Sequence, residues 1–407
     1  MPSISALAQG TPSAEAWRAV TAQLNGLGGA ALEAAVEAFE SNSAHWPSRL
    51  DPWQGYSADE GVELRRSPQD WVREVYAGLH SPKHRLCRIV DSPLRLRRGE
   101  ALENVLSPDA QLAQVRQIAF DQSKLSSGFL KAWRGEGPWR RWEALRLWTC
   151  GLSPANLKLV AAADLSAMTM LNLEQNKLGE GGVAAMVKAP GFSALRALHL
   201  GNNGLDAGAA QALSPARWLR GLTWLHLGDN RLSDTSMPLL TANGALEEVI
   251  ALDLSRNYVG ADTAAWAAGL PNLERLALNN TALEDQGLIG LVERCLELKH
   301  LKLDATRLGD RGVEALAQSR QRWRSISLMM TDISAAGLGT LLKSPSLQQV
   351  ERLELGTGFT RENAKILADG ACPNLTFLWW HGPELGDGAE AIVRGDARLA
   401  KCLPYPA

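Results

Sequence analysis

Two histidines and an aspartate stand at equal spacing along the chain, and together their side chains could do chemistry. His199, His226 and Asp253 follow one another at intervals of 27 residues. Imidazole nitrogens and carboxylate oxygens are ligands for divalent transition metals, and histidine changes its charge close to neutral pH. If a repeated structural element brings the three residues side by side, two interpretations are open: a site for a metal or for pH-sensitive binding, and a polar patch that contacts a protein partner. The second is favoured, because two histidines and one carboxylate on a flat sheet commonly occur without a metal.

A sequence repeat of about this length runs through most of the chain. Leu195, Leu198, Leu200, Asn203 and Leu205 spell the pattern L-x-x-L-x-L-x-x-N-x-L. Units with this pattern, at starts 24 to 27 residues apart, begin at residues 115, 142, 168, 195, 222, 249, 273, 298, 323, 350 and 375. Positions are counted below from the first residue of each unit. Such self-similarity indicates a solenoid of stacked units.

Each unit predicts one strand followed by one helix. The apolar residues at positions four and six have the two-residue period of a strand. Apolar residues at helical spacing follow, as in 181–188, 207–213, 284–295 and 310–318. Because one unit cannot bury its apolar side alone, the units must stack. The prediction is an α/β solenoid with a curved parallel sheet on the concave side and helices on the convex side.

The repeated pattern is the signature of leucine-rich repeats, and the chain resembles the ribonuclease-inhibitor-like class of leucine-rich repeat proteins. The stretches 178–183 (LGEGGV) and 308–316 (LGDRGVEAL) carry this resemblance, which covers roughly residues 112–390. The resemblance implies a strand and a full helix in each repeat. It also implies roles such as an enzyme inhibitor, a scaffold or the recognition arm of a secreted bacterial effector, among which the fold does not choose.

Position nine of the units carries two kinds of polar residue. It is Asn at 176, 203, 230 and 257, and Thr at 281, 306 and 331. An Asn amide offers two donors and an acceptor, so it can satisfy the turning backbone of neighbouring units, and a Thr hydroxyl offers fewer bonds. Gly358 and Pro383 offer none. We therefore expect looser stacking after about residue 350.

The chain is predicted to have three parts. Residues 1–110 do not repeat, contain apolar residues at helical spacing, and are predicted to form a helical N-terminal capping region. Within them, 86–106 resembles a degenerate zeroth repeat, with Ile89 at position four. Residues 111–390 form the solenoid of about eleven repeats, and residues 391–407 form the C-terminal cap and tail. Caps cover the ends that a solenoid would otherwise expose.

The face of the sheet formed by the outward side chains is the predicted binding surface. Neighbouring strands lie about 4.7–4.9 Å apart, so the position-five residues His199, His226 and Asp253 become neighbours. Gly201 and Gly228 at position seven predict a hollow beside the two histidines. The predicted partner-binding residues are Trp148, Glu174, His199, Trp224, His226, Asp253, His300, Lys302 and Trp379.

Composition narrows the possible functions. The formal net charge is −2, from 42 Lys+Arg against 44 Asp+Glu, so no global field draws the chain to nucleic acid or anionic lipid. Arg and Trp interleave over residues 131–148, which keeps nucleic-acid binding as a weaker hypothesis. The five scattered Cys argue against a disulfide framework. The absence of a signal-like start and of a long apolar run predicts a cytoplasmic protein, and the preference for Arg over Lys suggests a bacterial source.

The sequence contains no motif of a known enzyme class, so we predict that the chain is not an enzyme and has no cofactor and no bound metal. The main prediction is an intracellular protein–protein interaction module or scaffold that binds a partner protein on the concave face. One alternative is an enzyme or metal-dependent site in the His199, His226 and Asp253 row or in the N-terminal region. Another is a structural protein that self-associates.

Overall fold

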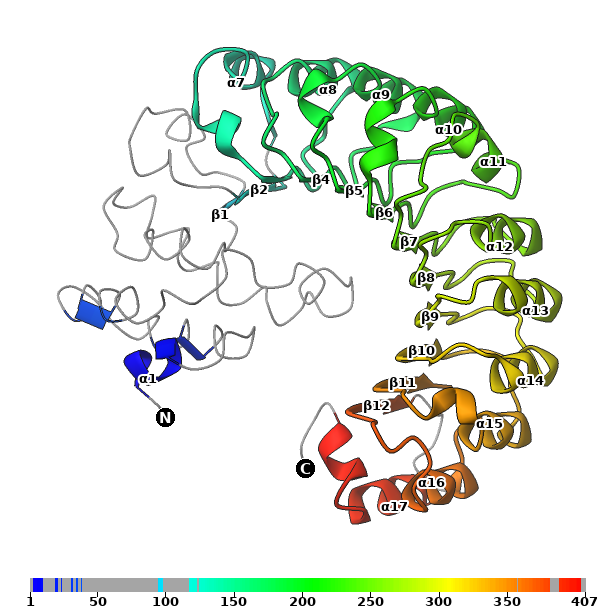
Figure 1. Ribbon diagram of the computed structural model, residues 1–407. Coiled ribbons are helices and arrows are strands. Elements are labelled where there is room, and N and C mark those ends of the chain that lie inside the picture. The colour runs from blue at the N-terminus through cyan, green and yellow to red at the C-terminus, as the bar shows by residue number, and fades with distance from the viewer. Residues whose placement is uncertain are drawn as a thin grey trace. The chain divides into compact units, whose positions relative to one another are not determined.

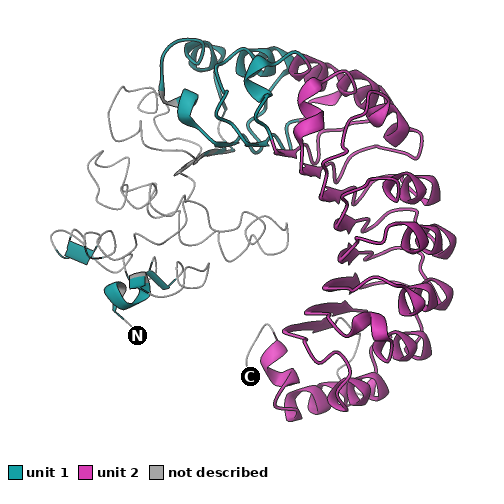
Figure 2. Ribbon diagram, in the orientation of Figure 1, with its two compact units in different colours: residues 1–176, 188–195 teal, residues 177–187, 196–407 magenta. Residues whose placement is uncertain are grey.

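The computed structural model describes residues 3–9, 94–97, 117–122, 124–356, 358–380 and 388–403, with the short pieces 19–20, 23, 31, 34–35 and 38. The chain divides into two compact units, coloured separately in Figure 2. Unit 1 contains residues 1–176 and 188–195, and unit 2 contains residues 177–187 and 196–407. Most of residues 1–110 lie outside the described residues, so the predicted cap and its boundary stay predictions.

Unit 1 contains four parallel strands that pair in sequence order, β1 with β2, β2 with β3 and β3 with β4. Its strands are β1 (Leu94–Arg97), β2 (Gln117–Asp121), β3 (Ala144–Arg146) and β4 (Met170–Asn172). Its helices are α1 (Ile4–Gln9), α7 (Ser127–Ala132) and α8 (Pro154–Ala161), with 3-10 turns at Pro138–Arg141 and Pro190–Phe192.

Unit 2 alternates strands and helices, and all its paired strands are parallel neighbours in sequence order. Figure 1 shows these strands on the inner side of the curved unit and the helices on its outer side. The strands are β5 (Ala197–His199), β6 (Trp224–His226), β7 (Ala251–Asp253), β8 (Arg275–Ala277), β9 (His300–Lys302), β10 (Ser325–Leu328), β11 (Arg352–Leu355) and β12 (Phe377–Trp380).

The helices of unit 2 alternate with its strands along the chain: α9 precedes β5, and each later helix follows one strand, as the strand-then-helix pattern predicts. They are α9 (Gly179–Met186), α10 (Ala207–Leu213), α11 (Ser236–Thr241), α12 (Ala261–Ala267), α13 (Asp285–Arg294), α14 (Asp310–Gln318), α15 (Ala335–Leu342), α16 (Arg361–Ala368) and α17 (Ala389–Gly395). Short 3-10 turns lie at Arg217–Gly221, Pro345–Leu347 and Leu399–Cys402. None of the described helices has the length and apolar character needed to cross a membrane.

The core of unit 2 lies between the sheet and the helices. From β5 to β11 the apolar residues at positions four and six are at most 2% exposed, as Leu198, Leu200 and Leu225 illustrate. Burial of such a side chain stabilises the fold by about 1.5–3 kcal/mol. The predicted repeat is confirmed as a leucine-rich-repeat-like α/β architecture, with one strand in each of the eleven predicted units.

Position nine joins successive units through side-chain amides, as predicted. Asn230 Oδ1 accepts hydrogen bonds from the backbone N–H groups of Asn203 and Leu205, each 3.0 Å away. Its Nδ2 donates to the carbonyls of Leu200 (3.0 Å) in the preceding unit and Leu227 (2.8 Å) in its own. In contrast, the hydroxyls at position nine of later repeats donate to a carbonyl of the same repeat, as those of Thr306, Thr281 and Thr331 do.

Position eight has a backbone conformation that the sequence pattern did not reveal. In nine successive units this residue has a left-handed φ between 51° and 58°. A side chain other than glycine is strained there. The turn that follows each strand is therefore made by the same strained residue throughout, namely Gln122, Thr149, Gln175, Asn202, Asp229, Arg256, Asn280, Ala305 and Met330.

A strand lies within the segment predicted as a zeroth repeat, but its register differs from the prediction. The structure pairs Leu94 of β1 with Ile118 of β2, and Ile118 holds position four of its unit. The prediction had placed Ile89 there. The segment LRLR alternates apolar and charged residues with the period of a strand, and that alternation indicates the strand better than the Leu spacing did. A strand thus lies inside the region predicted to be a helical cap.

Candidate functional site

We call one surface of the unit 2 sheet the strand face. It is the surface that faces away from the helices, and it is made by the position-three and position-five side chains of β5 to β12. On it, His199 of β5 is in register with His226 of β6, and His226 with Asp253 of β7. The two rings stack with centroids 5.6 Å apart and an interplanar angle of 23°. His226 Nε2 lies 3.2 Å from Asp253 Oδ2. The predicted neighbourhood of these three residues is confirmed.

The hollow predicted beside the two histidines is absent, because the His226 ring fills it. A Cβ atom at Gly201 would lie 2.6 Å from His226 Cε1, and a Cβ atom at Gly228 would lie 3.3 Å from His226 Nε2. Both distances are shorter than ordinary van der Waals contact. The two glycines therefore form a seat for the imidazole ring, and the space that they were predicted to leave empty is occupied.

Asp253 is ionised at neutral pH. Burial by itself would raise the pKa of Asp253, but the nearby charge of His226 and hydrogen bonds from His226 and Ser255 outweigh it and lower the pKa to about 2. The backbone N–H of Ser255 donates to Asp253 Oδ1 at 2.8 Å. The carboxylate is thus held on one oxygen by the backbone and presents the other to His226, which fixes the tilt of the imidazole.

His199 and Trp224 form the floor of this part of the strand face. His199 is only 2% exposed and Trp224 is 9% exposed. Their rings meet edge to face, with centroids 4.6 Å apart, a favourable aromatic geometry. Both were predicted to contact a partner directly, and both offer it little surface. His226 and Asp253 are half-buried and form the accessible part of the row.

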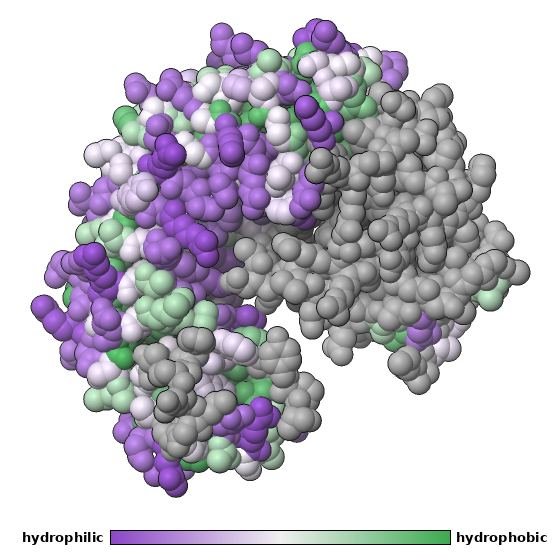
Figure 3. Space-filling view, turned by 180° about the vertical axis from the view of Figure 1, so that it is seen from behind, coloured by the Kyte–Doolittle hydropathy of each residue, from purple (hydrophilic) through white to green (hydrophobic). Residues whose placement is uncertain are grey.

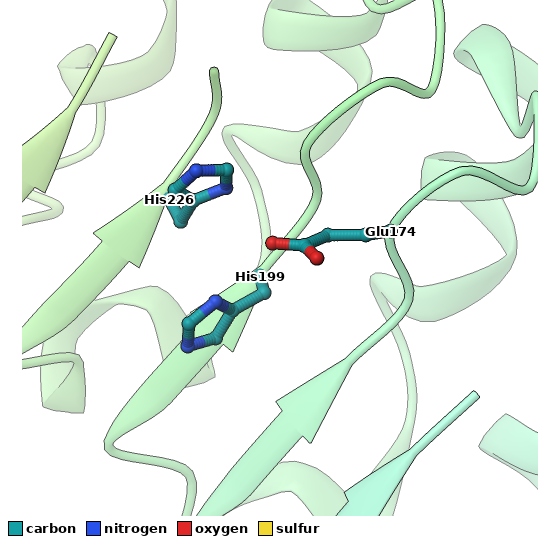
Figure 4. A group of neighbouring side chains, drawn as sticks. All are labelled: Glu174, His199 and His226. Carbon is teal, nitrogen blue, oxygen red and sulfur yellow. The ribbon is translucent and has the colours of Figure 1, made fainter. Parts of the chain in front are cut away.

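Figure 4 draws the two imidazoles of the row, together with Glu174, which belongs to unit 1. A ligand nitrogen of His199 and one of His226 lie within 4.8 Å of each other. Neutral imidazole is a common ligand of zinc, copper and nickel. The two rings are therefore candidates to hold a metal ion.

The remaining predicted residues of unit 2 lie further along the same face. His300 and Lys302 are half-buried on β9, and Trp379 is half-buried on β12. Burial, with the charge of Arg275 next in size, lowers the pKa of His300 to about 4, so this imidazole is neutral at physiological pH. The register places Lys302, Ser327, Glu354 and Trp379 in one row across four strands.

Asp304, close to Lys302 in the chain, is a buried polar residue that was not predicted to belong to the site. Asp304 Oδ1 accepts a hydrogen bond from Ser327 Oγ at 2.5 Å and one from the N–H of Met329 at 2.8 Å. Burial raises the pKa of Asp304. Arg352 Nε donates to Glu354 Oε1 at 2.6 Å. The sequence signal is the charged residue at position seven, the position that Glu174 holds in an earlier repeat.

Arg352 also anchors the far end of the strand face. Its guanidinium carbon lies 3.7 Å from the centroid of the Phe377 ring, within the range of a cation–π contact. Phe377 is in register with Arg352, and Trp379 with Glu354. The half-buried aromatic side chains of β12 therefore stand beside a fixed ion pair.

The two predicted residues of unit 1 are Trp148 and Glu174, and both are half-buried. The guanidinium of Arg146 lies 5.3 Å from the centroid of the Trp148 ring. The backbone N–H of Glu174 donates to Asn172 Oδ1 at 3.0 Å. Both residues thus follow strands of unit 1 at positions fixed by local contacts.

The other tryptophans of the Arg- and Trp-rich segment belong to the core of unit 1. Trp133, Trp139 and Trp142 are buried, and the rings of Trp133 and Trp142 meet edge to face with centroids 5.2 Å apart. Buried rings cannot stack on exposed bases. This removes the main support for the nucleic-acid hypothesis.

Comparisons with known proteins add little. A scan of protein families and a search of curated proteins both find no match. Among solved structures, an internalin (inlF) from Listeria monocytogenes str. 4b F2365 matches with a TM-score of 0.41 and 13% sequence identity, over 73% of this chain and 69% of that one. At this identity and TM-score, the match does not assign the chain to a family. The leucine-rich-repeat-like assignment therefore rests on the repeats observed in the chain itself.

Proposed function

We propose that the chain is a protein-binding module and that it binds its partner on the strand face of unit 2. The observation that carries the proposal is the in-register array of ionic and aromatic side chains on this face. Its accessible members are half-buried: His226, Asp253, His300, Lys302 and Trp379. Stacked repeats commonly present such extended surfaces to partners.

The chemistry of this surface favours a polar partner. In the described residues, the large hydrophobic side chains that are clearly exposed are Tyr258, Leu296 and Met330, and they lie in different units of the repeat. Figure 3 views the molecule from behind the view of Figure 1. Hydrophilic residues cover much of the described surface there, and hydrophobic residues form separate small patches. Interfaces that are not obligate resemble this mixture of polar and aromatic residues.

The strand face is pre-organised. Parallel pairing fixes the spacing of its strands, and the side-chain amides at position nine fix successive units to each other. His226 is held by Asp253, and Arg352 by Glu354. A partner would therefore bind with little loss of side-chain entropy, which favours affinity for a given contact area.

The test compares matched variants of the full chain in an affinity pull-down from a lysate of the source cell. Lys302→Glu and Trp379→Ala alter the strand face, and Arg311→Glu reverses an exposed charge on the helix face in α14. We expect Lys302→Glu and Trp379→Ala to lose a partner that wild type and Arg311→Glu retain. Equal capture by all four proteins would contradict the proposal. Circular dichroism confirms that each variant is folded.

The alternative function is that of a structural protein that self-associates, and light scattering distinguishes it from a monomeric protein-binding module. A molecular mass that stays at 44.0 kDa across protein concentrations argues against a self-associating structural protein. The ribonuclease-inhibitor-like class, the scaffold role, the absence of enzymatic activity, the cytoplasmic location and the bacterial source remain predictions from the sequence.

A further inference from the structure

Beyond partner binding, we propose that His199 and His226 form a binding site for a divalent transition metal ion such as Zn²⁺, with Asp253 as the residue that positions His226. Two imidazoles and a carboxylate stand in register on adjacent strands. All three residues belong to unit 2, and the site does not require a partner protein.

The distance between the rings suits a shared ion. A nitrogen of His199 lies within 4.8 Å of a nitrogen of His226. With Zn–N bonds of about 2.0–2.1 Å, two ligands of a tetrahedral ion stand about 3.4 Å apart. Because both histidines are on parallel neighbours of one sheet, small rotations of the rings close this gap without moving the backbone. The strands therefore pre-set the separation of the two ligands.

Asp253 determines which nitrogen of His226 faces the ion. Its Oδ2 lies 3.2 Å from Nε2, and a carboxylate there holds the proton on Nε2. Nδ1 is then the nitrogen that coordinates. Histidines that bind metals commonly donate their other N–H to a carboxylate, which fixes the tautomer and raises the basicity of the ligand. The pair of His226 and Asp253 has this arrangement.

The seat of the ring limits its motion. Gly201 and Gly228 lie beneath His226 so closely that a Cβ atom at Gly201 would come within 2.6 Å of the imidazole. On the other side, Trp224 packs against the His199 ring at 4.6 Å. Packing therefore restricts both imidazoles to the small rotations that bring their nitrogens to a common ion, so little rotational freedom is lost on binding. Two protein ligands leave positions on a four-coordinate ion for water or another donor.

The experiment titrates ZnCl₂ into the chelator-treated full-length protein by isothermal calorimetry. We expect about one equivalent to bind to wild type, and His226→Gln to weaken binding at least tenfold. Asp253→Asn should weaken it by about 10–100-fold, the usual effect of removing an outer-shell carboxylate. The matched control is His300→Gln, which removes a strand-face histidine outside the row and should leave the affinity unchanged.

A second measurement on wild type does not require any variant to fold. In protein labelled with ¹⁵N-histidine, Zn²⁺ should shift two of the seven imidazoles, and one of these should be metallated at Nδ1 with its Nε2 still protonated. Absence of Zn²⁺ binding by wild type would overturn the proposal. So would His226→Gln binding as tightly as His300→Gln, or ring shifts without the Nδ1 signature.

Discussion

The substitution Asn230→Thr isolates the role of the amides that join successive units. Asn230 is 7% exposed, so water cannot replace its hydrogen bonds. Threonine can keep the bond to the carbonyl of Leu227, as Thr306 does with Leu303 at 2.6 Å. It cannot accept from both N–H groups of the preceding unit, because its hydroxyl points back to its own unit.

The expected loss follows from the groups left without partners. The N–H groups of Asn203 and Leu205 lose their acceptor at 3.0 Å. A buried unsatisfied donor costs about 1–3 kcal/mol. Allowing for some local relaxation, Asn230→Thr should lower the free energy of unfolding by about 2–4 kcal/mol. A loss of 2 kcal/mol corresponds to about a 30-fold change in the local opening equilibrium.

Urea unfolding followed by circular dichroism measures the total loss, and hydrogen–deuterium exchange of a peptide spanning residues 203–205 locates it. The control is Thr306→Ala, which removes one hydrogen bond within its own unit and should cost about 1 kcal/mol. If Asn230→Thr cost no more than Thr306→Ala, or left exchange at Asn203 and Leu205 unchanged, the role assigned to the amides would be refuted.

Two further predictions concern the turns and the pH dependence of stability. Ala305→Gly should raise the free energy of unfolding by about 0.5–1 kcal/mol, because Ala305 has φ +53°, a conformation that glycine adopts without strain. The control Ala315→Gly, within α14, should lower the free energy of unfolding by a similar amount. Thermal unfolding of both variants checks the signs. Burial disfavours protonated His300 in the folded chain, so the unfolded state binds more protons between pH 6.5 and about 4 and stability falls as pH falls through this window. His300→Gln should remove about 1 kcal/mol of that fall between pH 7 and 5, after allowance for solvent screening, in urea titrations at the two pH values; an equal fall in both proteins would contradict this.

The repeat made the fold predictable, because every repeat has the same pattern of apolar and polar positions. Leucines at positions four and six have the period of a strand and are buried, and the equal spacing placed His199, His226 and Asp253 side by side. The role of the amide at position nine in joining two repeats was predictable from residue type, because an Asn side chain has enough donors and acceptors to bond to both.

The details that were missed depend on backbone geometry and on which side chain fills a space. Gly201 and Gly228 predicted a hollow, but the pattern could not show that the neighbouring His226 lies over both. The left-handed residue at position eight varies from Asn202 to Met330, so residue type gave no signal. The buried hydrogen bonds of Asp304 depend on the hydroxyl of the next strand, a contact that no spacing rule contains.

The most direct test of binding on the strand face is site-specific photocrosslinking. A benzophenone amino acid replaces Ala277 on β8, which is in register with Asp253 and Lys302, in one protein and Arg311 on α14 in another. Both proteins are irradiated in the source cell. The proposed function predicts a covalent adduct with one partner protein from position 277 and none from position 311. An adduct with the same partner from position 311, with none from position 277, would contradict it.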